Sequence, residues 1–123
     1  MKESELKKEI LKFINYFRDG KEMFLYGRCY WFAIILKERF DKQCGATIMY
    51  DPVMNHWATY ITGAGLFDAS GQIDDKGFVI WSTYKMYDKE HIKRLEAQCI
   101  NYTEDWYLMV IKQSIKRWLK WPI

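Results

Sequence analysis

The chain has 123 residues, of which 50% are hydrophobic and 18% aromatic, a composition that excludes a disordered chain and predicts one domain over residues 1–123. The net charge of +3 is a mild bias with acids and bases interspersed, which is not the strongly basic surface of a dedicated nucleic-acid binder. No apolar run approaches the ~20 residues that a membrane span needs, so we expect no membrane span.

Two helices are predicted in the first third of the chain. The first covers residues 2–18, where apolar side chains recur at helical spacing, and Asp19-Gly20 is expected to end it. A loop over residues 21–28 should lead into a second helix, from Cys29 to about Phe40. The dense apolar residues of this second helix predict that it is central and largely buried.

The hydrophobic pattern then changes to that of strands, and four are predicted between polar, Gly- and Pro-containing turns: 46–50, 56–62, 66–70 and 78–81. Helices are predicted again over residues 89–99, capped by Asp88, and after Thr103. This order predicts an α+β fold: N-terminal helices, one carrying Cys29 at its start, packed on a small antiparallel sheet, with C-terminal helices.

Cys29 is the first candidate for chemistry, because it follows Gly27-Arg28 and begins the most apolar helix. The first turn of a helix offers N–H groups and a partial positive charge, which favour a thiolate and can stabilise an oxyanion. Taken alone, Cys29 fits better as a small buried hydrophobic residue. Its role as a nucleophile therefore depends on its partners.

His56 and Asp68 are the candidate partners. His56 begins a strand and could take the thiol proton, although alone it could be an ordinary surface residue. Asp68 lies inside an apolar strand, where a carboxylate is costly unless it is paired. A turn centred on Gly63 would make the two residues diagonal neighbours, ~7–8 Å apart along the backbone. A turn centred half a residue later would put Asp68 on the opposite face.

Three stretches carry a family resemblance: residues 26–33 around Cys29, 55–60 around His56, and 66–71 around Asp68. Together they resemble the core of papain-like and transglutaminase-like proteins, in which G-x-C begins a helix, H-W or H-x-x-V begins a strand, and an acid ends the next strand. The resemblance implies an α+β fold without a cofactor. It also implies Cys29 as nucleophile, His56 as general base and acid, and Asp68 as the residue that orients His56.

The resemblance has one gap, at the second oxyanion donor. Papain has a glutamine several residues before its cysteine, whereas residues 21–28 here contain no Gln or Asn. Tyr26 is a candidate substitute, and Trp57 is a second candidate for the oxyanion site or the substrate groove. The short spacing between Cys29 and His56 predicts a minimal groove.

Other features suggest less. The three cysteines contain no CxxC pair, and no signal peptide is visible, which predicts a reducing compartment, the cytoplasm. A metal site including Cys44 is not expected, because no close ligand pair exists. Cys99 is expected in the core, and His91 in solvent.

A basic stripe is predicted on the last helix, made by Lys112, Lys116, Arg117 and Lys120. We favour a solvated helix face there; the alternative is a contact surface for RNA, DNA or an acidic protein.

Two functions remain open. The first is a small thiol enzyme (peptidase, amidase, deamidase or transglutaminase) that acts on a peptide or protein substrate. The second is a papain-like binding module with little turnover, such as a phage or mobile-element inhibitor of a host protein or nucleic-acid complex.

Overall fold

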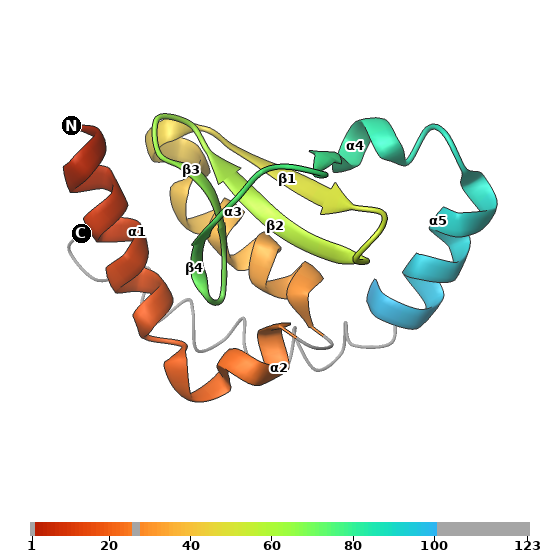
Figure 1. The fold of residues 1–123 in the computed structure, drawn as a ribbon, viewed down its shortest axis with the longest axis horizontal. Helices are drawn as coiled ribbons and strands as arrows, with labels where there is room; N and C mark the ends of the chain where they lie inside the picture. Colours follow the sequence, from red (N-terminus) through yellow and green to blue (C-terminus); the bar gives the residue numbers. More distant parts are fainter. Residues whose placement is uncertain (1, 26–27, 101–123) are drawn as a thin grey trace.

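The computed structural model describes residues 2–25 and 28–100, and its fold is α+β, as predicted (Figure 1). The elements are α1 (Glu3–Asn15), η1 (Arg18–Gly20), α2 (Lys21–Leu25), α3 (Cys29–Cys44), β1 (Ala46–Asp51), β2 (His56–Ile61), β3 (Gly65–Asp68), β4 (Gly71–Ile73), β5 (Val79–Ile80), α4 (Trp81–Tyr84), α5 (Lys89–Leu95) and the π-helical η2 (Glu96–Ile100). The helix predicted after Thr103, with its basic stripe, lies outside the described residues.

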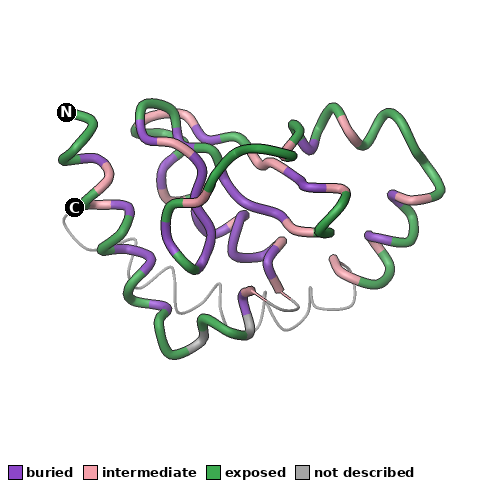
Figure 2. Tube along the Cα trace, viewed as in Figure 1, coloured by how far each residue is buried: buried purple, intermediate pink, exposed green. Residues whose placement is uncertain are grey.

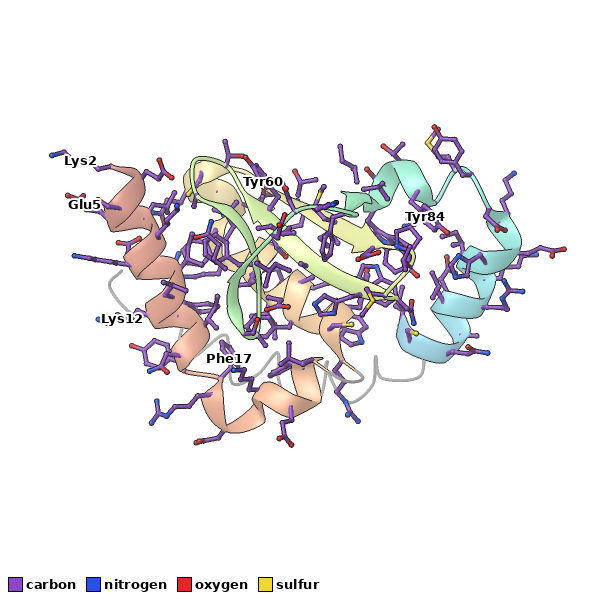
Figure 3. The ribbon with its side chains drawn as sticks, in the orientation of Figure 1. Lys2, Glu5, Lys12, Phe17, Tyr60 and Tyr84 are labelled. Carbon is purple, nitrogen blue, oxygen red and sulfur yellow. The ribbon has the colours of Figure 1, made fainter. Side chains whose placement is uncertain are left out.

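The apolar face of α1 is buried as its spacing predicts, while charged side chains such as Lys12 point outward (Figure 3). The helix ends at Asn15, earlier than predicted, and α2 replaces the loop that we predicted over residues 21–28. The reason lies in packing: the Phe17 and Phe24 rings meet edge-on with centroids 5.8 Å apart, which buries both. The chain therefore turns after α1, and the short helix α2 leads toward the start of α3.

The sheet has five antiparallel strands in the order β4-β3-β2-β1-β5. In the β2–β3 hairpin Thr59 pairs with Phe67 and Ile61 pairs with Gly65, so the turn is centred on Gly63. This is the register that places His56 and Asp68 on the same face.

Two strand predictions at the sheet edges were wrong in detail. Gly71, expected only to break the preceding strand, begins the extra strand β4; its φ of 115° permits the tight reversal in which it pairs with Asp68. The last strand is only Val79–Ile80, because Trp81 begins α4 and is buried against Tyr50.

The central helix α3 packs across the middle strands, as Figure 1 shows, and Figure 2 shows its inner face buried. Thr59 of β2 is fully buried, and its hydroxyl donates a 2.7 Å hydrogen bond to the carbonyl of Ala33. Since β4 and β5 occupy opposite edges, the segment over residues 74–78 must cross the sheet, and it passes in front of the middle strands. The described part of the chain contains no helix long and apolar enough to cross a membrane.

Candidate active site

Cys29 is the first residue of α3, and it is buried, with 9% of its surface exposed. The preceding residue, Arg28, takes a non-helical conformation, and no side chain caps the helix. The N–H groups of a first helical turn have no acceptor within the helix. The Cys29 sulfur therefore lies at the positive end of a 16-residue helix, next to backbone donors.

His56 and Asp68 meet across the β2–β3 hairpin. The His56 Nε2 lies 2.8 Å from Oδ2 of Asp68, and the two side chains are only 19% and 9% exposed. The register makes them diagonal neighbours, and the lengths of the two side chains close the remaining gap. With Nε2 bound to Asp68, Nδ1 is the ring nitrogen left for a second partner.

Asp68 also accepts hydrogen bonds from Ser70. The backbone N–H of Ser70 donates a 2.7 Å hydrogen bond to Oδ1 of Asp68, and the Ser70 hydroxyl donates to the same oxygen. Burial acts to raise the pKa of Asp68, but the hydrogen bonds from His56 and Ser70 outweigh it and lower that pKa overall. The carboxylate is therefore charged and fixed in orientation at neutral pH.

Hydrogen bonds to Asp68 and then to Cys29 raise the pKa of His56 to about 9, against the opposing effect of burial. The structure thus brings the three sequence-predicted residues into one chain of contacts, from thiol to imidazole to carboxylate. A histidine beside a thiol can accept the thiol proton as a general base. The Phe78 ring, on the segment that crosses the sheet, meets the His56 ring with centroids 6.2 Å apart.

A cavity of about 300 Å³ adjoins Cys29. Its lining residues come from α2, α3, the turn between β1 and β2, β2 and η2: Leu25, Cys29, Tyr30, Met54, Asn55, Trp57 and Cys99. This volume is at the lower end of the range for small-ligand pockets. None of these side chains is charged, so the cavity suits an uncharged group next to the sulfur.

Of the two predicted candidates for the oxyanion site or the groove, Tyr26 and Trp57, the structure describes Trp57. Trp57 lines the cavity, but it is 1% exposed, and its indole Nε1 is buried without a hydrogen-bond partner in the described structure. Its ring packs edge-on against Tyr30, with centroids 5.5 Å apart. Trp57 therefore forms a wall of the groove. Tyr26 lies outside the described residues.

Asn55 and Cys99 are among the cavity residues that sequence reasoning did not assign to the site. Asn55 was overlooked because its only local signal is its position directly before His56. Cys99, expected in the core, is partly buried against it and also lines the cavity, with its sulfur 4.0 Å from Nδ2 of Asn55. The π-helical turn that contains Cys99 interrupts the α-helical register of α5, so helical spacing could not place this side chain.

Cys44 and His91, the other residues considered for chemistry, do not line the cavity beside Cys29. Within the described ranges, no group of three His, Cys, Asp or Glu side chains could hold a metal ion, and Cys44 is at the opposite end of α3 from Cys29. His91 is half-buried rather than solvated, and its Nδ1 lies 2.8 Å from the Tyr84 hydroxyl. Figure 3 shows Tyr84 between the sheet and α5.

Comparison of the chain with models of protein families, with curated proteins and with solved structures found no match in any of the three. The chemistry of the site therefore rests on the geometry described above.

Proposed function

We propose that the chain is a small thiol enzyme of the papain-like or transglutaminase-like kind, which acts on a peptide or carboxamide bond through a thioester at Cys29. The observation that carries this proposal is the position of His56, whose imidazole hydrogen-bonds both the Asp68 carboxylate and the Cys29 thiol. A nucleophile, a base and a group that orients the base are the parts that covalent acyl transfer requires.

In the proposed reaction, the thiol proton moves to His56 and the sulfur attacks the carbonyl carbon of the substrate. The C–N bond then breaks, and the imidazolium returns its proton to the leaving nitrogen. Water attacks the thioester in a second step and gives the carboxylic acid and the free thiol. An amine in place of water gives a new amide, so the same site supports hydrolysis or transfer.

Each residue has a separate task in this mechanism. The charged Asp68 holds the ring so that Nδ1 faces the sulfur, and it stabilises the imidazolium that forms. N–H groups at the start of α3 are in place to bind the developing oxyanion. The small uncharged cavity limits the group next to the scissile bond, which favours a carboxamide or a short acyl segment over an extended peptide in a deep cleft.

The rate of iodoacetamide alkylation at each cysteine tests the proposal, because Cys44 and Cys99 are reference thiols in the same chain. We expect Cys29 to react fastest near neutral pH, and His56→Ala to slow it by at least ~10-fold. His91→Ala removes the other histidine and serves as the matched control, which should leave the Cys29 rate within about 2-fold of wild type. Equal rates at the three thiols, or an unchanged Cys29 rate in His56→Ala, would overturn the proposal.

A binding module with little turnover remains the second candidate. It is favoured by the turn between β1 and β2 beside the cavity, where Val53 is 88% and Met54 is 73% exposed. Exposed apolar side chains beside a pocket are typical of a protein contact. A pull-down with Cys29→Ser separates the two functions, because an enzyme loses its effect with this change, whereas a binding module retains both partner and effect.

A further inference from the structure

The candidate site contains a polar side chain, that of Asn55, which takes no part in the contacts among Cys29, His56 and Asp68. Asn55 directly precedes His56 and lines the cavity beside Cys29. Acyl transfer needs hydrogen-bond donors for the carbonyl oxygen, and the stretch over residues 21–28 contains no Gln or Asn that could add a side-chain amide to the helix N–H groups. Asn55 supplies an amide group at that cavity.

The orientation of the Asn55 amide is fixed by its neighbours. The Tyr50 hydroxyl donates a 2.7 Å hydrogen bond to Oδ1 of Asn55. Tyr50 is fully buried against Trp57 and Trp81, so this hydroxyl has little freedom to move. Burial, the largest cause, raises the pKa of Tyr50, which keeps the hydroxyl protonated and able to donate.

With Oδ1 turned to Tyr50, the Asn55 Nδ2 is left on the cavity side. Its contact there is the Cys99 sulfur, at 4.0 Å. Sulfur is a weak acceptor, so a carbonyl oxygen can replace it at little cost. In the described part of the chain, the Asn55 donor is thus held in place, exposed, and paired with a weak acceptor.

The backbone of Asn55 adds a second, independent observation. Its φ of 52° is the left-handed conformation, and no other non-glycine residue in the described ranges has a positive φ. Asn tolerates this conformation better than most residues, and such positions concentrate at functional sites. The same backbone conformation directs the Asn55 amide and begins the strand that carries His56.

We propose that Asn55 is the second carbonyl donor of the site, with Nδ2 hydrogen-bonding the oxygen of the acyl group that the Cys29 sulfur attacks. This inference rests on the proposed thiol chemistry. It assigns the site a preference for substrates in which an uncharged carbonyl lies next to Cys29, held between the start of α3 and Asn55.

The test compares two reactions of the same sulfur. Acetylation of Cys29 by 4-nitrophenyl acetate passes through a tetrahedral oxyanion and releases 4-nitrophenolate, whereas alkylation by iodoacetamide displaces iodide without an oxyanion. Mass spectrometry of the Cys29 peptide gives both rates. Asn55→Gly removes the amide and keeps a residue suited to the left-handed backbone, and Asn55→Asp replaces the donor with an acceptor.

We expect the ratio of acetylation rate to alkylation rate at Cys29 to fall by ~10-fold or more in Asn55→Gly and Asn55→Asp. Tyr50→Phe frees the amide to rotate and should lower the ratio by a smaller factor. Asn15→Asp, on the exposed side of α1, is the matched control and should keep the wild-type ratio.

A ratio unchanged in both Asn55 variants would overturn this inference, while an intact His56 dependence of alkylation would leave the thiol chemistry standing. A general loss of structure changes the accessibility of Cys29 and so changes the rates of acetylation and alkylation in the same direction. It therefore does not reproduce the expected fall in the ratio of the two rates. If alkylation of Cys29 does not depend on His56 even in the wild type, the proposed function fails first.

Discussion

The His56 Nε2 lies 2.8 Å from Oδ2 of Asp68, although the two residues are diagonal rather than opposite in the β2–β3 hairpin. This contact leaves the other ring nitrogen for Cys29, at the start of the central helix. One hairpin register and one helix terminus therefore bring Cys29, His56 and Asp68 together.

Asp68→Asn should lower the pKa of His56. The hydrogen bond to the charged Asp68 is the largest cause that raises this pKa to about 9, and a neutral amide stabilises an imidazolium less. A titration of the His56 ring by NMR checks this. Asp51→Asn is the control, because Asp51 is also buried in the described structure but is not a cause of the His56 shift. An Asp68→Asn variant that still titrates near 9 would contradict the assigned cause.

The raised pKa of His56 also predicts how stability depends on pH. A group whose pKa rises on folding stabilises the folded state fully below its unfolded pKa, and this contribution is lost as pH rises through the folded value. The wild type should therefore lose unfolding free energy relative to His56→Gln between pH 6.5 and about 9. Urea unfolding of both proteins across this range measures the difference. A difference that stays constant, or grows with pH, would reject the prediction.

Thr59→Val should destabilise the fold by about 1–3 kcal/mol, because it leaves the buried Ala33 carbonyl without the 2.7 Å hydrogen bond from Thr59. Thr47→Val, on the exposed face of the neighbouring strand, is the matched control and should change stability by less than ~0.5 kcal/mol. The midpoints of urea denaturation give both values. Equal effects at the two positions would show that the Thr59 hydroxyl does not hold α3 on the sheet.

Asp88→Ala should cost about 1 kcal/mol by removing the cap of α5, where the Asp88 carboxylate accepts a 3.0 Å hydrogen bond from the His91 N–H. Faster amide hydrogen exchange in the first turn of α5 should accompany this loss. Asp75→Ala, on the exposed crossing segment, is a suitable comparison. No change in exchange at His91 would mean that the cap contributes nothing to the helix.

The parts of the fold with a strong hydrophobic pattern could be predicted from the sequence. The buried face of α1, the start of α3 at Cys29 and the hairpin centred on Gly63 each follow from spacing within one segment. The contact of His56 with Asp68 was expected for one of two possible hairpin registers, and the structure has that register, with Thr59 paired with Phe67.

The rest depends on particular side-chain contacts and backbone conformations that hydrophobic spacing does not encode. α2 is only five residues long and exists because Phe24 packs on Phe17, and β4 depends on the backbone conformation of Gly71. The orientation of Asn55, in the turn between β1 and β2, requires the hydroxyl of Tyr50 on β1, and its contact with Cys99 requires the π-helical turn after α5. No local pattern carries this information.

The fate of an acetyl group on Cys29 tests the central claim most directly. After brief exposure to 4-nitrophenyl acetate, time-resolved mass spectrometry should show Cys29 acetylated well before Cys44 and Cys99, followed by loss of the acetyl group as water attacks the thioester. In His56→Ala, acetylation of Cys29 should slow to the rate of the other thiols. Equal acetylation of the three cysteines in the wild type, unaffected by His56→Ala, would contradict the account.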